Sequence, residues 1–173
     1  MIIEILIIII RFIILAGVQV LVLNNLQLGG LINPYLYVLF LLTLPVRTPR
    51  ILMLFIALTT GLVIDMFMNT MGMHAAACLL LGFVRPSWLK IMSPRDGYET
   101  DAVPGIRKFG FQWFLVYSSV MVLVHHTFLF YIEVFRFSEF FYTFLRVILS
   151  SIVTMILIII SHYLFSKPEG RNK

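Results

Sequence analysis

Charged residues are scarce in this chain of 173 residues: 12% are Asp, Glu, Lys or Arg, whereas 61% are hydrophobic. Soluble domains carry roughly 25% charged residues. With a mean hydropathy of +1.01, a water-soluble fold of this size would leave much of its apolar surface in contact with water. The composition therefore excludes a soluble globular protein. It predicts an all-α integral membrane protein whose residues 1–173 form a single membrane domain.

Cysteine is almost absent, since Cys78 is the only one. A single cysteine excludes an internal disulfide and any CxxC metal or redox motif, and the Ala-rich surroundings of Cys78 predict a small buried residue. The net charge of +5 is not gathered into a basic, aromatic-interleaved patch, because the basic residues stand singly between apolar stretches. This pattern argues against nucleic-acid binding.

Six apolar stretches are long enough to be considered as membrane spans, since about 20 apolar residues cross the hydrocarbon core. They cover about residues 2–23, 28–46, 51–68, 72–89, 112–133 and 141–165. Pro34 and Pro45 shape the ends of the second stretch. The strictly apolar part of the fourth is short, so this span is expected to be thin, tilted or partly re-entrant. We predict six transmembrane helices.

Basic residues between the spans predict the orientation. With the N-terminus in the cytoplasm, ten basic residues fall in inside-facing connections and one, Arg136, falls outside. The ten are Arg47, Arg50, Arg85, Lys90, Arg95, Arg107, Lys108, Lys167, Arg171 and Lys173. The positive-inside rule then places both termini and the connection 85–111 in the cytoplasm.

Ionisable residues inside the spans are candidate functional positions, because each is costly in lipid unless it is paired. Arg11 lies near the middle of the first span, and Glu4 is about 10.5 Å away along a helix axis, too far for direct contact. We expect Arg11 to tie two helices together, to reach the inner surface or to serve a substrate site.

Gly61, Asp65 and Asn69 recur every four residues and form one small, polar stripe on a helix. Ala57 and Gly61 predict close helix packing. Gly72 completes a tight turn, after which His74 begins the next span. Asp65 is expected to accept hydrogen bonds from the first N–H groups of that span, and a ligand or proton-relay role is the alternative.

Catalytic and metal-binding patterns are weak. His125 and His126 are adjacent and point about 100° apart on a helix, and no HxxxH or ExxH spacing includes them, His74 or His162. The hydroxyls of the Ser118-Ser119 and Ser150-Ser151 pairs have no neighbouring base or Gly-x-Ser-x-Gly context. We predict no enzyme, no metal and no cofactor.

Several short motifs carry a resemblance to a known family. They are Leu23-Asn24-Asn25, Asn33-Pro34-Tyr35, the run from Gly61 through Asp65, Asn69 and Gly72 to His74, Arg85-Pro86, and Ser93-Pro94-Arg95-Asp96-Gly97-Tyr98-Glu99. Together they resemble the rod-shape-determining MreD family in the form typical of Bacteroidota. The last two spans agree with that family in hydropathy and length only.

The resemblance implies a multi-pass protein of the bacterial inner membrane that acts as a scaffold in lateral peptidoglycan synthesis and rod shape. It implies an MreC-like partner and, through it, an MreB-like filament, a RodA-type glycosyltransferase and its transpeptidase. The implied fold is similar to the substrate-binding subunits of vitamin uptake transporters. No catalytic residues are carried over. The structural or interaction candidates are Asn33, Pro34, Gly61, Asp65, Asn69, Gly72, His74, Arg11, Arg85 and Pro86.

Three functions remain open from the sequence. They are a membrane scaffold, a small-molecule-binding subunit of a transporter, and an intramembrane enzyme, for which no nucleophile–base pair is evident. A transporter site should show broken helices or converging polar groups at mid-membrane depth, and Arg11 is the only deep charge that the sequence predicts. A scaffold needs a groove for a partner helix. The polar residues expected to line one are Gln19, Asn24 and Asn25 beside Gly17, or Ser150, Ser151 and Thr154.

Overall fold

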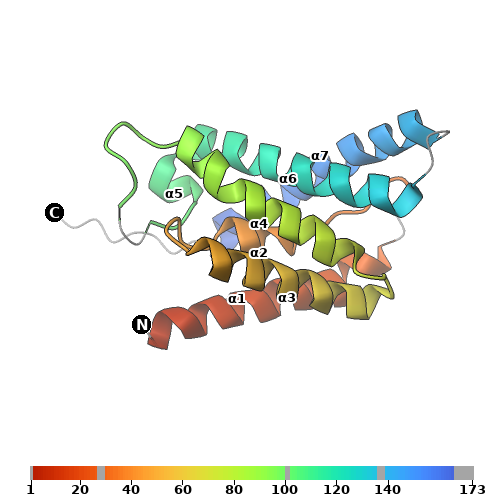
Figure 1. Cartoon of the computed structure of the whole chain (residues 1–173), viewed down its shortest axis with the longest axis horizontal. Coiled ribbons are helices and arrows are strands. Elements are labelled where there is room, and N and C mark those ends of the chain that lie inside the picture. The colour runs from red at the N-terminus through yellow and green to blue at the C-terminus, as the bar shows by residue number, and fades with distance from the viewer. Residues whose placement is uncertain (1, 27–29, 100–101, 136–138, 166–173) are drawn as a thin grey trace.

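The computed structural model describes residues 2–26, 30–99, 102–135 and 139–165. It is all-helical, with 77% helix, and the described residues contain no β-strand. Five long helices run lengthwise beside one another (Figure 1). They are α1 (Ile2–Leu21), α3 (Arg50–Met68), α4 (Met73–Ile91), α6 (Phe111–Val134) and α7 (Phe140–Phe165). Three short elements complete the fold: η1 (Leu23–Asn25), α2 (Val38–Leu42) and α5 (Ile106–Phe109).

Four of the helical segments are long and apolar enough to cross a membrane: Ile3–Asn25, Arg50–Met68, Phe111–Val134 and Phe140–Leu164. Helix α4 packs along α3 and along α6, and α6 packs along α7. These contacts explain why the bundle holds together although its outer surface is apolar. The prediction of an all-α membrane protein is thus supported by helix length and composition.

The predicted helix over residues 28–46 is wrong as a continuous helix. Residues 28 and 29 lie outside the described residues, and of residues 30–46 only the five of α2 are α-helical. Gly30 has a φ of 73°, and Pro34 lacks an N–H and disfavours a helical Asn33. We call residues 31–46 the central segment, because its part from Tyr35 to Leu44 is buried throughout. Figure 1 shows α2 in the middle of the bundle, where it packs against α1, α4 and α6.

Helix α4 is longer than the strictly apolar stretch predicted, and it continues through Arg85 and Pro86 to Ile91. Arg85 is 1% exposed, so counting it among the charges of a connection was wrong. Pro86 lacks the N–H that would bond the carbonyl of Gly82, four residues earlier, but it does not end the helix. Of the other charges used for the orientation, Arg136, Lys167, Arg171 and Lys173 lie outside the described residues.

The connection after α4 folds back on the end of the bundle. Tyr98 donates a hydrogen bond from its hydroxyl to the carbonyl of Leu89 at 2.8 Å, and burial raises the pKa of Tyr98 to about 12. Trp113 of α6 donates from Nε1 to the carbonyl of Met92 at 2.9 Å. The start of α1 and helix α5 lie at the same end of the bundle (Figure 1).

Candidate functional site

The buried Asp65 carboxylate joins α3 to the first turn of α4. Oδ1 accepts the backbone N–H of His74 at 3.0 Å, and Oδ2 accepts the backbone N–H of Ala75 at 2.9 Å. Oδ1 also accepts the hydroxyl of Thr70 at 2.5 Å and lies 3.1 Å from Nδ1 of His74. The backbone N–H groups of His74 and Ala75 are unpaired donors of a helix start, as predicted from the sequence. The positive end of the helix dipole also favours a carboxylate there.

The turn between α3 and α4 requires two left-handed residues. Asn69 ends α3 with a φ of 54°, and Gly72 precedes α4 with a φ of 80°. A Cβ at Gly72 would meet nothing within 4 Å, so glycine is needed here for its backbone conformation and not for space. Asn is the residue other than Gly that most readily adopts this conformation.

Gly61 is needed for space. A Cβ at this position would lie 2.3 Å from Cα of Ala75 and 2.6 Å from the carbonyl oxygen of His74. One turn earlier on α3, Ala57 contacts Gly82, whose own Cβ would lie 3.0 Å from that of Ala57. The close packing that the small residues predicted is therefore the contact between α3 and α4.

Five aromatic rings lie around Tyr35 in the core, and one of them is that of Tyr37, at 6.0 Å between ring centroids. The centroid of the Tyr35 ring lies 5.3 Å from that of His74, 6.1 Å from His125 and 5.4 Å from His126. Phe130 follows at 5.9 Å. The three imidazoles come from α4 and α6, so α4 and α6 meet on the central segment. No group of three or more His, Cys, Asp or Glu side chains able to hold a metal is found among the described residues.

Only some of the ring nitrogens of these three histidines make hydrogen bonds. His126 bonds the carbonyl of Val122 through Nδ1 at 2.9 Å and the Thr154 hydroxyl through Nε2 at 3.1 Å. Nε2 of His125 lies 2.8 Å from the Tyr37 hydroxyl. Nε2 of His74 and Nδ1 of His125 are buried without a hydrogen-bond partner.

The extended start of the central segment is held by side chains from α1 and α7. The N–H of Asn33 donates to Ser150 Oγ at 3.0 Å, that of Tyr35 to Thr154 Oγ1 at 3.0 Å, and that of Leu36 to Gln19 Oε1 at 2.8 Å. Non-helical backbone at membrane depth is tolerated only where protein groups satisfy it. These side chains therefore make the broken segment possible.

These polar side chains were expected to line a groove for a partner helix, but they are buried inside the bundle. Gln19 and Ser150 are 1% and 0% exposed, and Gln19 also donates to the carbonyl of Pro34 at 3.0 Å. Ser151 and Thr154 are buried as well. None of the four lies on a surface that a partner helix can reach, because each faces the interior of the bundle. The proposed grooves of polar anchors at the first and last spans are wrong for these residues.

Asn33 has a second role at the same end of the bundle. In the amide orientation that satisfies both groups, its Oδ1 accepts two hydrogen bonds from Arg146, from Nη2 at 2.9 Å and from Nε at 3.0 Å. Arg146 also pairs with Glu133 at 3.1 Å and lies 4.3 Å from the centre of the Phe130 ring. Asn33 thus connects the central segment to α6 and α7.

The other end of the central segment is held by Arg85. Its Nη2 donates to the carbonyls of Leu44 and Leu42, the latter at 3.4 Å, and its Nε donates to the Tyr117 hydroxyl at 2.9 Å. Tyr117 in turn donates to the carbonyl of Leu42 at 3.0 Å. The last carbonyls of a helix lack intrahelical partners and attract cations. Arg85 is therefore a buried cap for α2.

Arg11 of α1 also caps this end of α2, since its Nη1 donates to the carbonyl of Thr43 at 3.0 Å. This contact is the tie to another element that was one of the expectations. Asp65 and Arg85 are more deeply buried in the protein than Arg11, so Arg11 is not the only charged group inside the bundle. The sequence missed Tyr117, Gln19 and Thr154 as parts of this framework, and the signal that pointed to it was the Asn33-Pro34 break in an apolar stretch.

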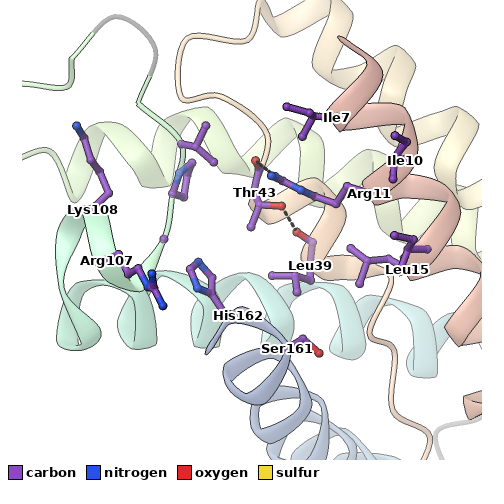
Figure 2. Close-up of a pocket in the computed structure, with 14 residues that line it drawn as sticks. Ile7, Ile10, Arg11, Leu15, Leu39, Thr43, Arg107, Lys108, Ser161 and His162 are labelled. Carbon is purple, nitrogen blue, oxygen red and sulfur yellow. Dashed lines mark hydrogen bonds between the residues drawn. The ribbon is translucent and has the colours of Figure 1, made fainter. Parts of the chain in front are cut away.

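A cavity of about 560 Å³ lies between α1, α2, α5 and α7 (Figure 2). Arg11 is the only one of the ten candidate residues that lines it. Comparisons of this chain with family models, with curated proteins and with solved structures find no match.

Proposed function

We propose that this chain is a non-enzymatic membrane scaffold of lateral peptidoglycan synthesis, similar to the MreD family, in the bacterial inner membrane. The five long helices and the central segment would make six crossings with both termini in the cytoplasm. The main support is that candidate residues make contacts between helices instead of gathering around the cavity. Nine of the ten do not line the cavity. Asp65, Gly61, Asn33 and Arg85 instead hold elements of the bundle together.

The exposed apolar surface of α1 favours a role in binding a partner protein. It contains the most apolar of the four candidate spans, with a hydropathy of 2.9, and only 17% of that window is buried inside the molecule. Ile3, Leu6 and Ile13 are 73%, 54% and 61% exposed. Helices associate in lipid by packing and not by the hydrophobic effect. We propose that an MreC-like partner packs a single helix on α1 and connects the chain to the MreB-like filament, the RodA-type glycosyltransferase and its transpeptidase.

The test is depletion together with affinity purification in mild detergent. We expect depleted cells to become round and the MreC-like protein to be recovered with the wild-type chain. Ile13→Trp on α1 should reduce recovery of the partner by at least half, whereas Ile51→Trp on α3, which is 85% exposed, should not. A change of cell shape without recovery of any wall-synthesis protein would reject the scaffold mechanism.

The orientation has its own test, cysteine labelling with a membrane-impermeant reagent. Cys78 is fully buried and gives little background. We expect Met71→Cys, at a fully exposed position in the α3–α4 turn, to be labelled from outside the cell. Lys90→Cys, at the exposed end of α4, should be labelled only after permeabilisation. The reverse labelling pattern would overturn the proposed orientation.

A small-molecule-binding subunit of a transporter is the second candidate. The observation that favours it is the broken central segment beside a cavity of about 560 Å³, because transport sites are often formed by discontinuous helices. This function predicts normal cell shape after depletion, loss of an uptake activity and a ligand that stays bound through purification.

A further inference from the structure

The cavity between α1, α2, α5 and α7 is positively charged. Arg11, Arg107, Lys108 and His162 are among the residues that line it, and no Asp or Glu of the described part of the chain does. Lys108 forms an ion pair with Glu99, which is mostly exposed. The two arginines, from α1 and α5, therefore bring positive charge to the cavity from two different helices.

Apart from Arg11, the α1 wall of the cavity is aliphatic. Leu15 and Leu39 are buried, whereas Ile7, Ile10 and Ile14 of α1 are 49%, 46% and 45% exposed. Figure 2 shows Ile7, Ile10 and Leu15 along α1, with Arg11 pointing from the same helix toward Thr43 and with Arg107 and His162 on the far side. Because α1 has little burial inside the molecule, this wall continues onto a surface that faces lipid.

This combination matches an amphiphile better than a simple ion. A free phosphate would pair with the arginines but would leave the isoleucine wall uncovered. A zwitterionic lipid would cover the wall but would bring its own cation to the arginines. Cavities of roughly 300–1,000 Å³ hold a drug-sized ligand. A volume of about 560 Å³ thus suits a phosphate headgroup and the first part of its chains.

The position of the cavity fits a headgroup. Arg107 and Lys108 lie on α5, directly before α6 begins, and His162 lies in the last turn of α7. The cavity therefore opens near the ends of long helices, where basic residues between helices attract anionic headgroups. Arg11 extends the positive charge inward from that end.

We propose that this cavity binds an anionic phospholipid, with the phosphate between Arg11 and Arg107 and the acyl chains along Ile7, Ile10 and Ile14. The site goes beyond the scaffold function and does not depend on it. A bound lipid would connect α1 to α5 and α7 through its headgroup.

The test uses the full chain purified in detergent, titrated with dioleoylphosphatidylglycerol and, separately, dioleoylphosphatidylcholine, with bound lipid counted by native mass spectrometry. We expect the anionic lipid to bind at least tenfold more tightly. Removing one charge with Arg107→Gln should weaken its binding about fivefold. Arg95→Gln removes an exposed charge outside the cavity and should change binding less than twofold.

Arg11→Gln should weaken binding as much as Arg107→Gln. Arg11 also donates a hydrogen bond to the carbonyl of Thr43, so Arg11→Gln could destabilise the fold. Its thermal unfolding is therefore measured. If this variant is destabilised, Arg107→Gln alone decides the result. Equal binding of the two lipids would overturn the proposal, as would unchanged binding by Arg107→Gln. Full displacement of phosphatidylglycerol by millimolar inorganic phosphate would show a free-anion site and would also overturn it.

Discussion

The Gly61→Leu variant is expected to lose most of its folded population. Even the first side-chain atom at this position would lie 2.3 Å from Cα and 2.5 Å from the backbone nitrogen of Ala75. Both are backbone atoms that cannot rotate away, so α3 and α4 must separate. Overpacking of a tight core costs about 1–3 kcal/mol and sometimes more. We expect a loss of at least 3 kcal/mol in the free energy of unfolding, measured by titration with a denaturing detergent.

Matched alanine variants separate packing from glycine's own flexibility. Gly17 lies within α1 and has nothing within 4 Å of its added Cβ, so Gly17→Ala should be neutral or slightly stabilising, because Ala favours helices more than Gly. Gly61→Ala should lower the free energy of unfolding. Equal stability of the two alanine variants would contradict the close contact between α3 and α4.

The Asp65→Ala variant is expected to be similarly destabilised, for a different reason. It removes the acceptors of the backbone N–H groups of His74 and Ala75 and of the Thr70 hydroxyl. Each buried donor left unpaired costs about 1–3 kcal/mol. The expected total is therefore about 3 kcal/mol or more, seen as a lower free energy of unfolding and a lower protein level in cells.

Asp65→Asn provides the graded comparison, because its amide oxygen keeps one acceptor for the start of α4, and it should fall between Ala and wild type. Asp96 lies exposed in the connection after α4, and Asp96→Ala should change stability by less than about 0.5 kcal/mol. Wild-type stability of Asp65→Ala would show that the carboxylate is not needed as a helix cap.

The α3–α4 hairpin could be predicted from the sequence because its determinants are local. Gly61, Asp65 and Asn69 repeat every four residues, and Gly72 and His74 follow within a few positions, so helix geometry alone places them together. The close packing at Gly61 and the hydrogen bonds of Asp65 are both present. The four apolar helices with span length follow equally directly from hydropathy.

The central segment and its supports were decided only by the tertiary structure. Hydropathy does not distinguish apolar residues that face lipid from those buried in protein. Residues 28–46 therefore resembled a helical span, although of the described residues 30–46 only α2 is α-helical. The side chains that satisfy its backbone are distant in sequence, since Tyr35 and Thr154 are 119 positions apart. In the sequence, Arg85 resembled a charged residue of a loop, but it lies inside the bundle and caps α2. Such pairings depend on which helices pack together, and no local pattern in the chain specifies that.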